Sequence, residues 1–283
     1  MNTLETAKLS IKISRPRFWF YLTGPYTVGC IYGASSYSDL LKPWFFIYFF
    51  YFLVLANIFL YGVNDFWDYE TDLLNPKKDE KEYRVAKTER KKIRSINFSI
   101  LGISVILLTL QNSILQRIIF GSFVFFSYFY SAEPLRFKNK PILDSASNVL
   151  YILPGVFGYY LASGKLPDSI ILLAGFLHTF AMHLFSAIPD IEFDKKTGIN
   201  TTAVILGRNN SLIICLLAWS GLSYIAITVA NSNLSYLTLI YPIITANLLL
   251  MGKKVSSVYW FYPYINIGLG GLMFTLKAIN TNW

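Results

Sequence analysis

Nine stretches of mostly apolar residues determine what this chain can fold into. A helix needs about 20 such residues to cross a bilayer, and each stretch must be helical because backbone polar groups in lipid have to be satisfied within the segment. The predicted spans are residues 18–37, 43–64, 95–112, 114–131, 145–163, 169–189, 211–230, 233–251 and 258–279. Only 14% of the residues are charged, against about 25% in soluble domains. We therefore expect an all-α polytopic membrane protein, with one transmembrane domain over residues 1–283.

The basic residues gather on one side of this arrangement. Of the 25 Lys and Arg residues, 21 lie in five alternate segments, at 1–17, 65–94, 132–144, 190–210 and 252–257. Positively charged loops remain in the cytoplasm, so the N-terminus is predicted to be cytoplasmic and the C-terminus outside, in the plasma membrane of a prokaryote. The same rule explains the net charge of +9 without a nucleic-acid partner.

A dense acidic sequence, NDFWDYETD, follows the second span. Its residues Asn64, Asp68 and Asp72 are spaced i, i+4 and i+8, which places them on one stripe of a helix. Asp190 and Asp194 repeat this spacing after the sixth span. Hard oxygen ligands suit Mg²⁺, which typically joins one or two carboxylates to substrate phosphates. We expect the two clusters to hold Mg²⁺ ions around a diphosphate, in an active site that opens to the cytoplasm.

A diphosphate also needs positively charged partners, and basic residues lie near both clusters. The candidates are Arg15, Lys77, Arg84, Arg136, Lys138 and Lys195. Topology alone accounts for many basic residues on this side. Arg136 and Lys138 are more specific because they lie at a span end beside Tyr130, a candidate catalytic residue whose hydroxyl can donate to a phosphate oxygen.

The remaining interior is expected to be apolar and aromatic. The chain has 23 Phe, 20 Tyr and 6 Trp residues, and such a cavity would shelter an isoprenoid tail and stabilise an allylic cation through ring faces. His178 and His183 lie five residues apart in the sixth span, so they do not share one helix face. We interpret both histidines as packed, hydrogen-bonded residues.

Together these motifs resemble those of the UbiA superfamily of intramembrane prenyltransferases. The family patterns NDxxDxxxD, YSxxPxRxK and DxxxD correspond to residues 64–72, 130–138 and 190–194. The resemblance covers nearly the whole chain and implies nine helices around a central cavity. It also implies Mg²⁺-dependent transfer of an allylic prenyl group from its diphosphate to a lipophilic acceptor.

Within the superfamily the chain resembles the lycopene elongase branch most. The residues that carry this likeness lie at 14–19, 22–25, 75–78, 190–194 and 198–203. This resemblance implies dimethylallyl diphosphate as donor and lycopene or a related carotenoid as acceptor. The loop after the first motif lacks the Arg-Pro pair common in members with aromatic acceptors, which disfavours a hydroxybenzoate.

Three alternatives remain open. The acceptor can be a quinone precursor or another lipid, or the protein can be an intramembrane terpene cyclase without a second substrate. A cation transporter is the third, and it is disfavoured because transporters place ionisable residues near the bilayer midplane, whereas the acidic residues here lie at span ends. Besides the prenyl diphosphate, the acceptor and membrane lipid, no obligatory protein partner is predicted.

Overall fold

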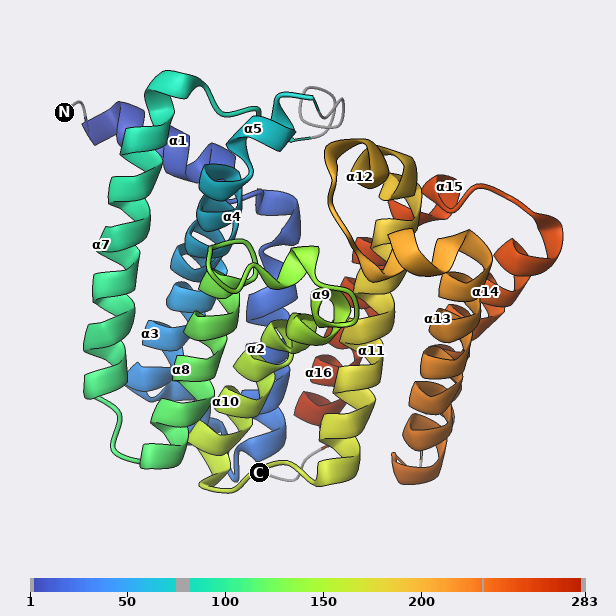
Figure 1. The fold of residues 1–283 in the computed structure, drawn as a ribbon. Coiled ribbons are helices and arrows are strands. Elements are labelled where there is room, and N and C mark those ends of the chain that lie inside the picture. Colours follow the sequence, from blue (N-terminus) through green and yellow to red (C-terminus); the bar gives the residue numbers. More distant parts are fainter. Residues whose placement is uncertain (1–2, 75–81, 231, 281–283) are drawn as a thin grey trace. The chain divides into compact units, whose positions relative to one another are not determined.

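The computed structural model describes residues 3–74, 82–230 and 232–280, and all regular secondary structure in these ranges is helical (Figure 1). The chain divides into two compact units. Unit 1 comprises Met1–Arg136, Leu153–Leu166 and Gly270–Trp283, and unit 2 comprises Phe137–Ile152 and Pro167–Leu269. Each unit is described by itself below.

Within the described ranges, five helical segments are long and apolar enough to cross a membrane. They are Pro43–Trp67, Lys87–Thr109, Ser169–Thr197, Thr202–Val229 and Asn233–Met251. A shorter apolar helix spans Ile114–Phe129. These segments confirm the predicted all-helical membrane character, whereas the count of nine spans stays a prediction.

Two of the predicted spans are not continuous helices. The segment 145–163 is broken into α9 (Leu143–Ala146), a 3₁₀ turn (Ser147–Tyr151) and α10 (Leu153–Ser163). The segment 258–279 begins only after a break between α15 (Ser256–Tyr259) and α16 (Tyr262–Asn280). A proline follows each break, at positions 154 and 263, and proline is tolerated in the first turn of a helix but not in its interior.

Unit 1 is built from helices that run beside one another (Figure 1). In addition to α10 and the end of α16, they are α1 (Thr3–Ile13), α2 (Phe20–Gly33), α3 (Pro43–Phe50), α4 (Ala56–Trp67), α5 (Tyr69–Asp72), α7 (Arg90–Thr109) and α8 (Ile114–Phe129). Helix α4 packs against α7 and α8. The core between α4 and α7 includes Phe59 and Ile93, and it supports α4 up to the end where the first acidic cluster begins. A second, aromatic cluster joins Phe52 of the turn ahead of α4, Phe120 of α8 and Phe157 of α10, whose rings are in mutual contact.

Helices α2 and α10 approach each other closely at glycines. A Cβ atom on Gly29 would lie 2.0 Å from the carbonyl oxygen of Gly155, and one on Gly158 would lie 2.5 Å from that of Tyr26. Small residues allow the backbones of two membrane helices to touch. Neither glycine has a positive φ. Glycine is therefore needed at these positions because the two helix backbones touch, and not because of an unusual backbone conformation.

A π-helical turn, Tyr51–Leu55, joins α3 to α4 without interrupting the helix. Such turns contain one residue more than the α-helix around them and occur often at functional sites. The side-chain amide of Asn57 donates to the carbonyl oxygens of Phe52 (2.8 Å) and Leu53 (3.0 Å). The turn is therefore held by a side chain that is itself fully buried.

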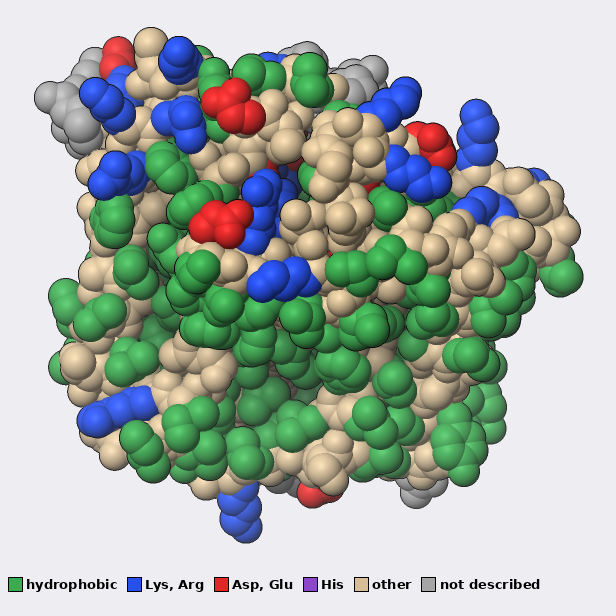
Figure 2. All heavy atoms as spheres, in the orientation of Figure 1, with side chains coloured by type: hydrophobic (Ala, Val, Ile, Leu, Met, Phe, Trp, Pro, Cys, Tyr) green, Lys and Arg blue, Asp and Glu red, His purple; other side chains and the backbone are tan. Residues whose placement is uncertain are grey.

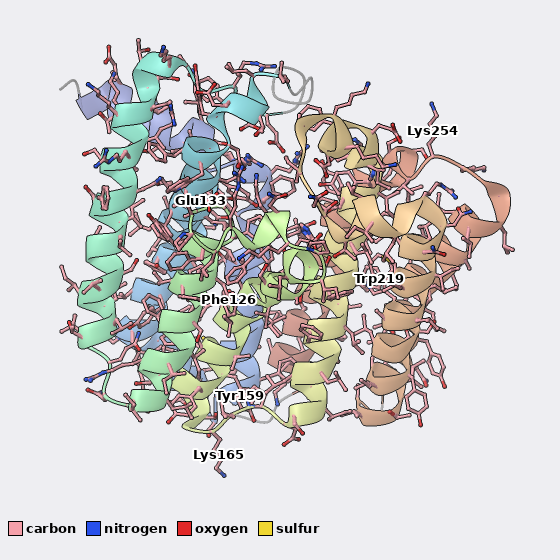
Figure 3. All side chains as sticks on the ribbon, in the orientation of Figure 1. Phe126, Glu133, Tyr159, Lys165, Trp219 and Lys254 are labelled. Carbon is pink, nitrogen blue, oxygen red and sulfur yellow. The ribbon has the colours of Figure 1, made fainter. Side chains whose placement is uncertain are left out.

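Unit 2 is organised around α11 and α13. Its helices, besides α9, α15 and the start of α16, are α11 (Ser169–Ala187), α12 (Ile191–Thr197), α13 (Thr202–Val229) and α14 (Ile240–Met251). Trp219 lies on the side of α13 that packs against α11 (Figure 3). Its ring stacks on Tyr241 and Tyr262, with centroid distances of 5.5 Å in both cases. The core of this unit is a packed aromatic cluster.

The surface separates charged from apolar regions in each unit. In the face drawn in Figure 2, Lys and Arg side chains of unit 1 gather over α1 and the start of α7, and those of unit 2 gather over α12 and α15. Hydrophobic side chains cover the flanks of the long helices in the same view. This division is what a lipid-embedded helical protein requires.

Candidate active site

The first acidic cluster forms where α4 ends. Asp68 leaves the helical conformation (φ −95°, ψ 4°), but its amide still donates to the carbonyl of Asn64 at 2.9 Å. The amide of Asp72 donates to the carbonyl of Asp68 at 2.8 Å. The i, i+4 register therefore continues through the break. The Asn64 Nδ2 donates to Asp68 Oδ2 at 2.6 Å, so these two side chains lie side by side.

The amide of Asn64 is held from both sides. Its Oδ1 accepts from the guanidinium of Arg15 at 3.3 Å, and its Nδ2 donates to Ser131 Oγ at 3.0 Å. Since an arginine can only donate, the oxygen must face Arg15, and the nitrogen then faces Asp68. Asn64 thus orients the carboxylate of Asp68, which is only 3% exposed.

Arg15 is bound by two carboxylates of unit 1. Its Nη2 lies 2.9 Å from Asp65 Oδ1 and its Nη1 lies 2.9 Å from Glu82 Oε2, while the guanidinium lies 4.7 Å from the centre of the Tyr61 ring. Burial works to lower the pKa of Arg15, but the charges of Glu82 and Asp65 outweigh it and raise that pKa. Arg15 therefore ties the chain ahead of α2 to the acidic cluster.

Two further arginines contact the cluster. Arg136 Nη2 lies 3.5 Å from Asp68 Oδ1, and its side chain is 25% exposed. Arg84 donates to the backbone carbonyl of Asp72. Tyr130 is half-buried and caps the C-terminus of α8, with its amide donating to Phe126 at 2.9 Å. Unit 1 thus places three predicted diphosphate ligands, Arg15, Arg84 and Arg136, at the predicted metal ligands.

The backbone is strained where two of these arginines leave it. Arg15 has φ 50° and Arg136 has φ 38°, in the left-handed region that non-glycine residues rarely adopt. Both side chains contact the NDxxD sequence. Such strain persists only where the surrounding structure enforces it, and it is common at functional sites.

The second acidic cluster lies in unit 2, where α11 continues into α12. Asp194 is buried at 8% exposure, and Asp190 is half-buried. Lys195 is 52% exposed and lies 3.9 Å from the exposed Glu192. Lys138 is half-buried in the 3₁₀ turn Phe137–Asn139. The roles of these residues, and the sharing of one diphosphate by both clusters, stay predictions.

One predicted residue, Lys77, lies outside the described residues. Within the described ranges, no group of three or more His, Cys, Asp and Glu side chains is arranged to hold a metal ion. The four predicted aspartates nevertheless carry the hard oxygen donors that Mg²⁺ prefers.

Sequence reasoning missed a buried carboxylate in unit 2. Asp144 is 0% exposed, and it accepts hydrogen bonds from the amide of Thr202 at 2.9 Å and from the hydroxyl of the same residue. The Thr202 hydroxyl in turn accepts from the amide of Ile142 at 2.6 Å. The first turn of α13 is therefore fixed to the start of α9. The signal for this carboxylate in the sequence was an aspartate directly before the predicted span 145–163.

The long apolar helices are those of a membrane protein, and the ion pairs of Asp65 and Asp68 lie where α4 ends. The sequence matches the UbiA prenyltransferase family over residues 22–259. The chain belongs to this family, and it is a prenyltransferase.

Curated relatives confirm the predicted likeness to lycopene elongases. The chain is 40% identical over 272 residues to a "lycopene elongase/hydratase" of Haloferax volcanii, covering 94% of this chain and 87% of that protein. It is 38% identical over 267 residues to a protein of the same description from Halobacterium salinarum, covering 94% and 95%.

Solved structures show the same fold. A UbiA homologue from Archaeoglobus fulgidus, solved with GPP and Mg²⁺, matches with a TM-score of 0.69 and 20% identity, over 94% of this chain and 99% of that one. A structure described as concerning digeranylgeranylglyceryl phosphate synthase matches with a TM-score of 0.72 and 17% identity, over 98% and 100%.

Proposed function

We propose that this prenyltransferase moves a dimethylallyl group from its diphosphate to a terminal alkene of lycopene or a related carotenoid, with Mg²⁺ as the metal. The 40% identity to the Haloferax lycopene elongase/hydratase, over 94% of the chain, carries this proposal. Donor and metal are supported by the Archaeoglobus UbiA homologue, which was solved with DMAPP and Mg²⁺. They are also supported by the NDxxDxxxD and DxxxD sequences of this chain.

Asp68, Asp72, Asp190 and Asp194 are proposed to hold the metal. Mg²⁺, when bound, would neutralise the negative charge that develops on the departing diphosphate. Asn64, a predicted ligand, holds the carboxylate of Asp68 through its amide nitrogen. This contact keeps one carboxylate oxygen in a fixed direction before any substrate arrives, which is the preorganisation that electrostatic catalysis requires.

The basic residues are proposed to bind the diphosphate oxygens. Arg136 is suited to this because it already contacts Asp68 and remains 25% exposed, so its remaining donors can reach a phosphate. Lys138, Lys195 and Arg84 add positive charge, and Tyr130 is proposed to donate its hydroxyl. Arg15 makes its described contacts with Asp65 and Glu82, so we assign it to holding the cluster together.

The chemistry then divides into two steps. The C–O bond between the prenyl group and the diphosphate breaks. Its electron pair leaves with the diphosphate, which gives an allylic cation. The π electrons of the acceptor alkene form the new C–C bond and leave a tertiary cation on the acceptor. Apolar and aromatic side chains exclude water from these cations, whose positive charge ring faces can stabilise.

The orientation of the protein follows from its charges and is part of the proposal. Basic residues are concentrated in the segments that also hold both acidic clusters, so we place the N-terminus and the diphosphate side in the cytoplasm. We also propose that residues 1–283 act as one catalytic domain.

The acceptor is tested by expressing the protein in cells that accumulate lycopene. We expect carotenoids heavier than lycopene by one or two C5 units, detected by mass spectrometry. Asp68→Ala and Asp190→Ala should remove these products while the protein stays in the membrane. These losses should be at least 100-fold, the scale of a lost electrostatic contribution.

Other outcomes would identify the alternatives. Unchanged lycopene in cells that contain the protein and dimethylallyl diphosphate would refute the acceptor. Prenylation of an added quinone precursor would then assign a different acceptor, and cyclised prenyl products without an acceptor would indicate a terpene cyclase. Full activity in either alanine variant would refute the two-cluster site.

A further inference from the structure

The buried carboxylate of Asp144 has a second neighbour in unit 2. The imidazole Nε2 of His183 lies 3.9 Å from Asp144 Oδ2, the same oxygen that accepts the Thr202 amide. This distance is too long for a hydrogen bond, but it is short enough for the carboxylate to stabilise a protonated ring in a low-dielectric interior. Asp144 itself is fixed by Thr202 and cannot turn away.

His183 also lies on the same side of α11 as the second acidic cluster. Asp190, in the 3₁₀ turn Ile188–Asp190 that continues α11, follows His183 by seven residues, which is close to two helical turns. His183 is therefore placed about two turns deeper along the helix than the carboxylate proposed to face the diphosphate. Its side chain is 16% exposed, whereas Asp144 is fully buried.

The proposed reaction also requires a base. Once the new C–C bond has formed, the tertiary cation must either lose a proton from a neighbouring carbon or gain water and then lose a proton. None of the residues proposed to hold the metal or the diphosphate accounts for this second half of the reaction. A neutral histidine is the side chain most often used to accept such a proton.

We propose that His183, supported by Asp144, is the base that ends the reaction, and this proposal rests on the proposed function. In elongation, the C–H bond beside the cationic carbon breaks, its electron pair forms the new C=C bond, and the proton moves to a ring nitrogen of His183. In hydration, a lone pair of water forms the C–O bond, and the proton lost by that oxygen moves to the same nitrogen. Asp144 stabilises the resulting imidazolium.

The other histidine of α11 is not placed for this role. The His178 ring packs against Tyr241 at a centroid distance of 4.9 Å. Its Nδ1 is buried, with no hydrogen-bond partner among the residues that the structure describes. No described carboxylate forms an ion pair with it, whereas His183 has Asp144. His178 is thus a matched control in the same helix.

The test compares the variants His183→Gln, Asp144→Asn and His178→Gln in membranes supplied with lycopene and dimethylallyl diphosphate. Three quantities are measured: released diphosphate, the KM for the donor, and the ratio of alkene-terminated to hydroxyl-terminated products. Binding of a non-reacting thiolo analogue of the donor, with Mg²⁺ present, reports whether each variant has folded.

We expect His183→Gln to lower turnover about 100-fold, the smaller end of what general bases contribute. The KM for the donor and binding of the analogue should stay within about twofold, and the product ratio should change because deprotonation and hydration no longer share a base. Asp144→Asn should give the same change in ratio with a smaller loss of turnover, because the imidazole remains. His178→Gln should resemble the unmodified protein.

Three results would overturn the proposal. In the first, His183→Gln keeps turnover and product ratio within threefold of the unmodified protein. In the second, it loses analogue binding together with turnover, which would show a structural role. In the third, the unmodified protein makes nothing heavier than lycopene, which refutes the proposed acceptor and this inference with it; the first two refute this inference alone.

Discussion

Replacing Gly29 with alanine should weaken the contact between α2 and α10. The added Cβ would lie 2.0 Å from the carbonyl oxygen of Gly155, 2.8 Å from its carbonyl carbon and 3.0 Å from its Cα. All three are backbone atoms, so no side-chain rotation relieves the overlap. Restoring ordinary non-bonded separations near 3.5 Å requires a helix shift of about 1.5 Å.

The expected cost follows from two opposing effects. Overpacking of this kind costs about 1–3 kcal/mol, and removing a glycine from a helix interior returns about 0.5–1 kcal/mol. The free energy of unfolding should therefore fall by about 1–2 kcal/mol. For a chain of this size this corresponds to a Tm lower by about 2–8 °C, measured by thermal unfolding of the purified protein in detergent at one fixed scan rate.

Gly24 supplies the matched control. It lies in the same helix, and a Cβ there meets nothing within 4 Å. Gly24→Ala should leave the Tm unchanged or raise it slightly, because only the helix-propensity effect remains. Equal Tm values for the two variants would refute the argument that backbone contact, rather than composition, holds α2 to α10.

Three further predictions concern charges and hydrogen bonds. Removal of divalent metal with EDTA should abolish turnover, and added Mg²⁺ should restore it, as an assay of released product would show. Arg15→Met removes the guanidinium that lies 2.9 Å from the carboxylate of Asp65, which is only 2% exposed, so the free energy of unfolding should fall by about 3 kcal/mol and the Tm with it. Thr202→Val removes the hydroxyl donor to Asp144 and should cost about 1–3 kcal/mol in the same unfolding assay.

Matched variants separate these effects from general damage. Arg17→Met removes a positive charge that lies over the Phe18 ring, where a cation–π contact is worth about 0.5–2 kcal/mol. Thr228→Val alters the exposed end of α13, where the hydroxyl bonds only to carbonyls of its own helix. If either control lost as much stability as its partner variant, the buried contacts would not be the cause. Activity that survives EDTA would contradict the metal requirement.

Hydropathy predicted several of the long apolar helices well, because the length of a membrane span is set by the lipid. The span 233–251 coincides with Asn233–Met251, and 114–131 nearly coincides with Ile114–Phe129. The break within 145–163 was not predicted. Pro154 in the first turn of α10 is a local signal for the break, whereas no periodicity within a window reports that Asp144 binds Thr202, 58 residues away.

In the candidate site, the sequence predicted contacts within one helix but not contacts between separate segments. Spacing alone indicated that Asn64 and Asp68 are neighbours, since i, i+4 residues meet on any helix, and these side chains are in contact. Spacing could not show that Arg15 would bind Asp65 and Glu82, because that pairing depends on how separate segments fold together.

The π-helical turn at Tyr51–Leu55 restricts how this chain can change in length. A single additional residue in a helix advances everything beyond it by about 100° of rotation. Deleting one residue from this turn would preserve the apolar character of the span and its helical conformation. It would nevertheless rotate Asn64 and Asp68 by about a quarter turn, away from the arginines that hold them. Insertions and deletions here are therefore equivalent to active-site mutations, although the turn lies within a lipid-spanning segment and carries no charged residue.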